Sequence, residues 1–285
     1  LKQIDHAGVF WRAVHQLTQG RSTFERKKGK QSGDLKNISF VLVDEFQDLT
    51  PRFMQLFEAW ITLQPEVQFF CVGDDWQAIY GFNGSNLNYF KRFNEFFSNS
   101  VEMMLDTNYR STSDIVGVSN KIMQGLGPPG RSSIDNGEAA QVCDFSALKT
   151  VPTEDNKFGN YPKFPATLFR LIKDLLTRNE SVQILSRTNH PPKTINLGES
   201  SGRVSGKLEQ IQEFLTRDLP DEQRGRVSVS TVHKFKGSEA DAVIVWDALP
   251  KKFPLLHPDW VFDRIFGESL LDKFSEERRL FYVAT

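Results

Sequence analysis

The stretch Phe40-Val41-Leu42-Val43-Asp44-Glu45-Phe46-Gln47-Asp48 decides the fold. Its first four residues are apolar, a run that is too short for a helix core and that suits a strand buried on both faces of a parallel sheet. Asp44 and Glu45 follow at once, and ligands of open α/β sheets bind outside the carboxyl ends of the strands. Adjacent acids there can divide the work on a nucleotide: one organises a hydrated Mg²⁺ on the phosphates and the other positions the attacking water. An ordinary acidic loop is the alternative, and Gln47 and Asp48 count against it because they add two more polar groups at the same edge.

The same succession of apolar strand and polar loop recurs in the first half of the chain. Residues 67–72 form a second predicted strand that runs into Gly73-Asp74-Asp75-Trp76-Gln77, and a helix over residues 51–61 separates the two strands. Residues 101–105 form a third predicted strand, which ends at Asp106-Thr107-Asn108-Tyr109-Arg110-Ser111. A strand, a helix and a second strand with polar loops at both carboxyl ends make a βαβ unit, which delivers these loops to one crevice.

The second half repeats this alternation, so the sequence predicts an α/β protein with parallel sheets flanked by helices. A helix over residues 168–176 precedes a strand over 182–185, which ends in Arg187-Thr188-Asn189. A helix over 208–216 leads into the segment from Val227 to Glu239, a buried strand follows over 242–246, and the last predicted element is a polar helix over 276–284. Residues 141–145 are a further strand candidate, and the basic run at residues 26–30 is expected to be a solvated loop.

Length and composition indicate a globular protein of about two domains. The chain has 285 residues, of which 25% are charged and 39% hydrophobic. No apolar run reaches the roughly 20 residues that span a bilayer, so we expect no membrane partner and a cytoplasmic location. The two cysteines have no neighbours at metal spacing, which makes a disulfide framework or a zinc site improbable. The net charge of -1 does not exclude nucleic acid, because a basic groove can coexist with a neutral total.

Five residue clusters stand in the order of motifs II to VI of the UvrD/Rep-type superfamily-1 helicases, and the chain resembles that family over residues 43–285. The clusters are Val43-Asp44-Glu45-Phe46-Gln47-Asp48, Val72-Gly73-Asp74-Asp75-Trp76-Gln77-Ala78-Ile79-Tyr80, Asn108-Tyr109-Arg110-Ser111, Thr231-Val232-His233-Lys234-Phe235-Lys236-Gly237-Ser238-Glu239 and Glu276-Glu277-Arg278-Arg279-Leu280-Phe281-Tyr282-Val283-Ala284. The second cluster, and the spacing of about forty residues between Asn189 and Thr231, most resemble the helicase IV branch, which lacks the large 2B insertion of UvrD and Rep.

The resemblance implies an ATP site between two RecA-like domains. Asp44 would hold Mg²⁺ through water, Glu45 would activate the hydrolytic water, and Gln77 would sense the γ-phosphate and relay its state toward DNA. Arg110 would reach the γ-phosphate as a finger across the cleft. Metal and guanidinium charge around the phosphoryl oxygens stabilise the loose transition state of phosphoryl transfer, so the chemistry agrees with these roles.

The remaining ATP-binding residues implied by the family contact the nucleoside. Tyr109 would stack on the adenine, because a planar aromatic ring gives base-tolerant contact with a purine. Glu239, which follows Gly237 in the fourth cluster, would bind the ribose.

The resemblance also implies contacts with single-stranded DNA. Tyr80 and Phe82 stand where the family places aromatic rings that stack on bases, and such stacking does not depend on sequence. Core packing is the alternative for Phe82, and a structural hydrogen bond between loops is the alternative for His233. Asn83 departs from the family pattern, which has an arginine there. The residues matched to positions near the DNA strand are Tyr80, Phe82, Arg187, Asn189, Thr231 and His233.

One family motif is absent. The phosphate-binding pattern Gly-x-x-x-x-Gly-Lys-Ser/Thr does not occur: Gly29-Lys30 is followed by Gln31, and Gly206-Lys207 is followed by Leu208. The last cluster also stops before the Thr-Arg-Ala that continues it in the family. We therefore interpret the chain as a fragment of a longer helicase.

Together these observations predict two RecA-like domains, the first incomplete: part of domain 1A over residues 1–109 and domain 2A over residues 110–285. The parent protein would be an ATP-dependent DNA helicase with ATP and Mg²⁺ as cofactors, acting on single-stranded DNA and duplex/single-strand junctions. This fragment alone is expected to be inactive. The alternative is a non-catalytic nucleic-acid-binding or interaction module derived from a helicase.

Overall fold

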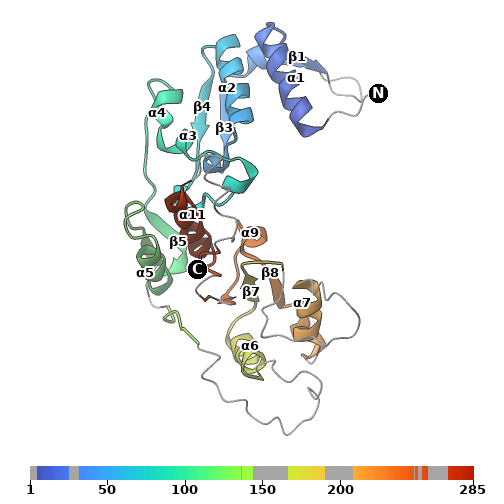
Figure 1. Ribbon diagram of the computed structural model, residues 1–285, viewed down its shortest axis with the longest axis vertical. Helices are drawn as coiled ribbons and strands as arrows, with labels where there is room; N and C mark the ends of the chain where they lie inside the picture. Colours follow the sequence, from blue (N-terminus) through green and yellow to red (C-terminus); the bar gives the residue numbers. More distant parts are fainter. Residues whose placement is uncertain are drawn as a thin grey trace. The chain divides into compact units, whose positions relative to one another are not determined.

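The computed structural model describes residues 5–25, 32–135, 137–143, 166–189, 208–217, 219–246, 248–249, 252–255 and 269–285 (Figure 1). The chain divides into two compact units, Leu1–Met104 and Leu105–Thr285. Each unit contains parallel strands with helices packed against them, so the expected α/β class is confirmed. The assignment of RecA-like domains with a boundary after residue 109 stays a prediction. Among the described helices, none has the length and apolar character of a membrane span.

The first unit is built on the parallel pair β3 and β4, with Val43 opposite Cys71 at the carboxyl ends. Before this pair come a helix and a short antiparallel hairpin, and after it come two short helices. The described elements are α1 (His6–Thr18), β1 (Thr23–Glu25), β2 (Ser32–Asp34), η1 (Leu35–Asn37), β3 (Phe40–Val43), η2 (Phe46–Asp48), α2 (Pro51–Leu63), β4 (Gln68–Cys71), η3 (Asp75–Gln77), η4 (Gly81–Asn83), α3 (Asn88–Lys91) and α4 (Phe93–Phe96).

Helix α2 connects the two strands and covers one face of the sheet. It begins with Pro51 at its first turn, where the missing N–H would have no helical partner. Its apolar stripe buries Met54 and Phe57, and the Phe57 ring lies 5.1 Å from that of Phe69 on β4. The predicted helix and the predicted βαβ order are therefore confirmed.

The prediction that residues 40–43 are buried on both faces was wrong. Burial alternates along β3, with Phe40 67% and Leu42 77% exposed, and Phe70 on β4 is 65% exposed. The inward residues Val43 and Phe69 pack on the core formed with α2 and the segment that contains α3 and α4. Within the described part of the chain only this face of the two-stranded sheet is covered, so the other face stays accessible.

Two other strand predictions need correction. Residues 101–105 form no strand, and Val101, Met103 and Leu105 are each at least 85% exposed. The strand begins later, at Thr107, because residues 107–112 find a parallel partner in residues 131–134 and the apolar run before them finds none among the described strands. Of the candidate at residues 141–145, the first three residues are not in a strand and the last two lie outside the described residues.

The second unit contains two parallel sheets. One consists of β5 and β6, and the other is three-stranded with the order β8-β7-β9. The described elements are β5 (Thr107–Thr112), α5 (Ser113–Ile122), β6 (Arg131–Ile134), α6 (Ala166–Arg178), β7 (Val182–Ser186), α7 (Leu208–Thr216), α8 (Asp221–Arg224), β8 (Val227–Thr231), α9 (Val232–Phe235), β9 (Ala242–Val245) and α11 (Leu270–Val283).

The central strand β7 organises the larger sheet. All five of its residues are buried, as expected for a parallel strand with neighbours on both edges. Ile184 lies in a core with Ile172 of α6 and Ile211 of α7. Parallel pairing brings Ser186 opposite Thr231, so the loops after β7 and β8 leave the same edge of the sheet.

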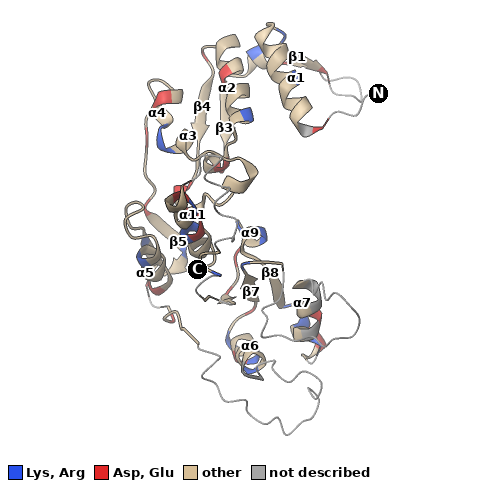
Figure 2. Ribbon diagram, viewed as in Figure 1, with Lys and Arg blue, Asp and Glu red and all other residues tan. Residues whose placement is uncertain are grey.

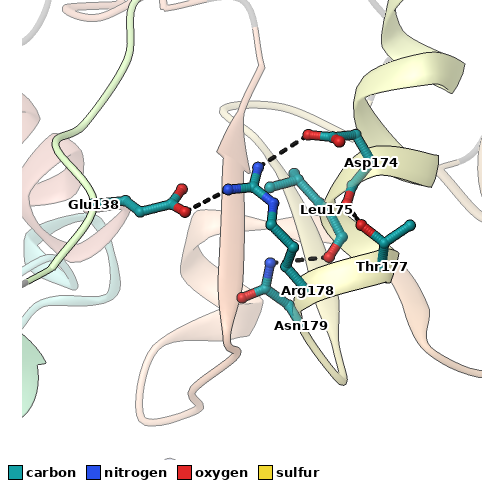
Figure 3. Close-up of polar contacts among 6 residues, drawn as sticks. All are labelled: Glu138, Asp174, Leu175, Thr177, Arg178 and Asn179. Atoms are coloured by element: carbon teal, nitrogen blue, oxygen red, sulfur yellow. Dashed lines mark hydrogen bonds and ion pairs between the residues drawn. The ribbon is translucent and has the colours of Figure 1, made fainter.

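The end of α6 is held by a small polar cluster around Arg178 (Figure 3). Its guanidinium contacts Asp174 one turn earlier at 2.9 Å and also pairs with Glu138, which follows β6. Asn179 adds a side-chain bond to the Leu175 carbonyl. Because these ion pairs are exposed, they orient the end of α6 and contribute little to its stability.

Candidate nucleotide and DNA site

Asp44 and Glu45 lie where β3 ends, at a sharp turn of the backbone. Glu45 has φ 52° and ψ 41°, the left-handed region that non-glycine residues seldom adopt. The Asp44 carboxylate accepts the Glu45 amide at 2.8 Å, and the Phe46 amide donates to the Val72 carbonyl at 2.9 Å. Both carboxylates are therefore exposed at the carboxyl end of the sheet, as the sequence predicted.

A buried glutamine joins this turn to the loop after β4. Gln47 is only 1% exposed; its amide nitrogen donates to Glu45 at 2.5 Å, and its amide oxygen accepts the Asp74 backbone N–H at 2.9 Å. Asp74 in turn accepts the Trp76 amide at 2.9 Å and the Gln77 side-chain amide at 2.8 Å. The structure thus brings Asp44, Glu45 and Gln77 together through two residues that we did not assign a role. In the sequence, only one weak signal pointed to Gln47 and Asp74: both are polar residues within the strand-end clusters.

The aromatic residues predicted to stack on DNA follow directly. Tyr80 is half-buried, Phe82 is 61% exposed, and their ring centroids are 6.1 Å apart. Phe82 is therefore not part of a core, whereas Trp76 in the same loop is buried. Asn83 ends the short helix η4 beside them and is exposed.

In the second unit, a polar hollow gathers the predicted nucleoside and γ-phosphate residues. Arg110 lies on β5 and its Nε contacts a Glu239 carboxylate oxygen at 2.8 Å. The Asn108 side chain accepts the Arg110 and Ser111 amides, which fixes the backbone around Tyr109. The hollow is lined by Asn108, Tyr109, Arg110, Asn179, Ser181, Glu239, Ala240 and Asp241.

Gly237 makes the loop that carries Glu239 possible. Its φ is +80°, a conformation that residues with a side chain seldom adopt. The loop follows α9, which begins at the carboxyl end of β8, and reaches the beginning of β9, where Asp241 accepts hydrogen bonds from the backbone and hydroxyl of Ser181. Glu239 therefore lies toward the amino ends of β7 and β9.

The predicted DNA-binding residues of the second unit lie at the opposite, carboxyl edge of its sheet. Arg187 is largely buried and forms a bidentate ion pair with Glu277. Its Nε donates to Oε2 at 3.1 Å and its Nη2 donates to Oε1 at 2.5 Å. The Thr231 hydroxyl accepts the Lys234 amide and so begins α9, and Asn189 is exposed. Burial lowers the pKa of His233, the positive charge of Arg187 lowers it further, and Glu277 opposes both. Arg187 and Thr231 thus already have protein partners in this structure.

The residues at the end of β3 fit a magnesium ion that arrives with a nucleotide. Among the residues that the structure describes, no three His, Cys, Asp or Glu side chains gather into a metal-binding group. Mg²⁺ bound with nucleotide phosphates takes one or two carboxylates and keeps several waters. The exposed carboxylate of Asp44 meets that requirement, and the Glu45 carboxylate is exposed beside it.

The residues predicted to bind ATP therefore fall into two sets. Asp44, Glu45 and Gln77 are gathered in the first unit; Tyr109, Arg110 and Glu239 are gathered in the second. That the two sets line one nucleotide cleft stays a prediction.

Comparison with known proteins gives two family matches and several relatives. Residues 5–98 match the UvrD/REP helicase N-terminal domain, and residues 203–285 match the UvrD-like helicase C-terminal domain. The chain is 29% identical to DNA helicase IV of Escherichia coli (strain K12) over 99% of its length, which is 35% of that protein. It is 27% identical to a probable DNA helicase of Mycoplasma pneumoniae over 87% of its length, or 42% of that protein. A shorter match, 32% identity over 29% of the chain, is to the ATP-dependent DNA helicase UvrD2 of Mycobacterium tuberculosis, of which it covers 11%.

The chain thus spans well under half the length of these relatives, and its two matched segments lie one in each compact unit. The chain belongs to the UvrD-like helicases and holds segments of both their N-terminal and their C-terminal domains.

Proposed function

We propose that the chain is part of an ATP-dependent DNA helicase, which couples ATP hydrolysis to translocation on single-stranded DNA and to unwinding at duplex/single-strand junctions. The observation that carries the proposal is the connection of Glu45 through Gln47 and Asp74 to Gln77. It joins the group suited to activate water to the loop that carries the exposed ring of Phe82.

For hydrolysis, each proposed residue has a distinct task. Glu45 orients the attacking water and accepts its proton, and Gln77 contacts the γ-phosphate. Asp44 holds the Mg²⁺ that accompanies ATP, and the ion supplies positive charge at the phosphate oxygens. Arg110 adds a second positive charge there once its guanidinium leaves Glu239.

Nucleoside and DNA contacts complete the proposal. Tyr109 stacks on the adenine and Glu239, on the loop turned by Gly237, accepts the ribose hydroxyls. Tyr80 and Phe82 stack on DNA bases at roughly 1 to 3 kcal/mol per base. The remaining DNA contacts that we propose are Arg187, Asn189, Thr231 and His233.

The activity belongs to a protein that also supplies a phosphate-binding loop. The 285 residues contain no Gly-x-x-x-x-Gly-Lys-Ser/Thr pattern, whose backbone amides and lysine hold the β- and γ-phosphates. We therefore expect the chain by itself to turn over no ATP. Hydrolysis by the purified chain that disappears in Glu45→Gln would contradict this part of the proposal.

The test compares Glu45→Gln with the wild type in the full-length protein. The substitution keeps the size of the side chain and removes the base, so DNA-stimulated kcat should fall about 100- to 10,000-fold with little change in KM. Glu58→Gln is the matched control, because Glu58 is exposed on α2 and lies outside the proposed site. Equal rates for Glu45→Gln and wild type would reject the role of Glu45.

A further inference from the structure

The side chain of Gln47 forms hydrogen bonds with both strand-end loops of the first unit. Its side chain is buried beside Phe46 and Leu49 of the apolar core, where an amide without partners would be costly. Both ends of the amide are used: the nitrogen by Glu45 and the oxygen by the backbone of Asp74. The buried position is therefore compatible with a polar residue only while these two loops keep their places.

The chemistry of the two partners fixes the orientation of the amide. The Asp74 backbone N–H can only donate, so the Gln47 oxygen must face it. This leaves the NH₂ group for Glu45, whose ionised carboxylate can only accept. A glutamate at this position could accept from Asp74 but could not donate to an ionised Glu45, and a methionine could do neither.

The backbone next to Asp74 is shaped to receive this side chain. A Cβ atom on Gly73 would lie 2.6 Å from the Gln47 amide oxygen and 2.9 Å from the Phe90 ring. Only glycine lets the loop approach the amide this closely. Beyond it, Asp74 holds the side-chain amide of Gln77, so an unbroken series of bonds runs from Glu45 to Gln77.

We propose that Gln47 is a positioning residue that holds the Glu45 carboxylate and the Asp74–Gln77 turn in one fixed geometry. It does not touch the reacting atoms; it sets where the proposed base and the proposed γ-phosphate contact stand relative to each other. Because η4 with its exposed Phe82 follows the same turn, Gln47 also transmits changes at the DNA-facing loop to Glu45. This inference rests on the proposed function.

The test measures ATP hydrolysis by the full-length protein with and without single-stranded DNA. Gln47→Met and Gln47→Glu should each lower DNA-stimulated kcat about 10- to 100-fold, since a hydrogen bond to a charged group is lost. KM and the binding of a fluorescent ATP analogue should stay unchanged, and the stimulation by DNA should shrink. Gln183→Met is the matched control, because Gln183 is also a buried, doubly hydrogen-bonded glutamine but lies inside β7.

A combined substitution separates positioning from a general loss of stability. If Gln47 acts through Glu45 and Gln77, then adding Gln47→Met to the double variant Glu45→Gln/Gln77→Ala should not lower its rate further. A further drop, or equal losses of kcat in Gln47→Met and Gln183→Met, would overturn the inference. Loss of analogue binding together with kcat would do the same.

Two further variants separate failure of the positioning role from misfolding and from failure of the proposed function. Where Gln47→Met does not fold, Gly73→Ala displaces the amide oxygen without removing it and should reproduce the fall in kcat at constant KM. Full activity in a folded Gly73→Ala protein would count against the inference. If Glu45→Gln still hydrolyses ATP, the proposed function has failed. If Glu45→Gln is inactive but Gln47→Glu keeps full activity, only the positioning role of Gln47 has failed.

Discussion

At the scale of single residues, His233 shows how burial changes the character of a predicted DNA contact. Burial and the adjacent Arg187 lower its pKa from the usual value, so the neutral imidazole predominates at neutral pH. A neutral ring can exchange hydrogen bonds with DNA but adds no charge against the phosphates. The unfolded chain binds the proton more readily than the folded one, so the second unit should lose stability as the pH falls below about 6.5.

The pH dependence can be measured by urea unfolding between about pH 7.5 and 5.5. In His233→Gln, which cannot take up the proton, the denaturant midpoint should fall less steeply with decreasing pH than in the wild type. Identical slopes for the two proteins would show that His233 does not contribute to the pH dependence.

At the scale of elements, Arg278 fastens the last helix to α5. Its guanidinium, on α11, donates to the Ile122 carbonyl at 3.0 and 2.6 Å and to the Gln124 carbonyl at 2.8 Å. Carbonyls at the end of a helix have no hydrogen-bond partner within the helix. The Arg278 guanidinium therefore supplies donors to two carbonyls that would otherwise bond to water. Charges of both signs follow one another along α11 (Figure 2), and the placement of Arg278, not the net charge, determines this contact.

Removal of the Arg278 contact should lower the stability of the second unit. Arg278→Ala should lower the free energy of unfolding of the second unit by about 1 to 3 kcal/mol, because a charged donor to carbonyl groups is lost. Hydrogen exchange of the amides in residues 113–124 should become faster. Arg92→Ala is the control: its exposed pair with Glu95 lies in the first unit, and the protection of α5 should not change. Unchanged exchange in Arg278→Ala would mean that α5 does not depend on α11.

At the scale of the whole molecule, two hydrophobic cores account for the two units. One core is centred on Phe46, Met54 and Phe57, and the other on Ile172, Ile184 and Ile211. Each core draws its residues from one unit. Ile184→Ala should destabilise the second unit by about 2 to 5 kcal/mol, because a fully buried side chain leaves a cavity.

Hydrogen exchange monitored by mass spectrometry can locate this loss. Peptides from residues 168–185 and 227–232 should lose protection, while peptides from residues 46–63 should keep it. Leu42→Thr is the contrasting variant, because Leu42 is 77% exposed and its replacement should change little. Loss of protection in both units after Ile184→Ala would contradict the separation of the cores.

The sequence by itself determined the order of most helices and strands and placed polar side chains directly after several strands. Short apolar runs marked β3, β4, β7 and β9, because hydrophobic patterning and local turn preferences act over a few residues. The same patterning was wrong at residues 101–105, since an apolar run becomes a strand only where another strand pairs with it.

Only the tertiary structure decided which of these residues meet. The bond between Gln47 and Asp74 spans 27 positions, and the pair of Arg187 and Glu277 spans 90. Such contacts depend on how strands align and how side chains fill the space between them, which no local pattern encodes. The exposed face of β3 has the same origin: its residues are as apolar as those of a buried strand, and burial depends on what packs against them.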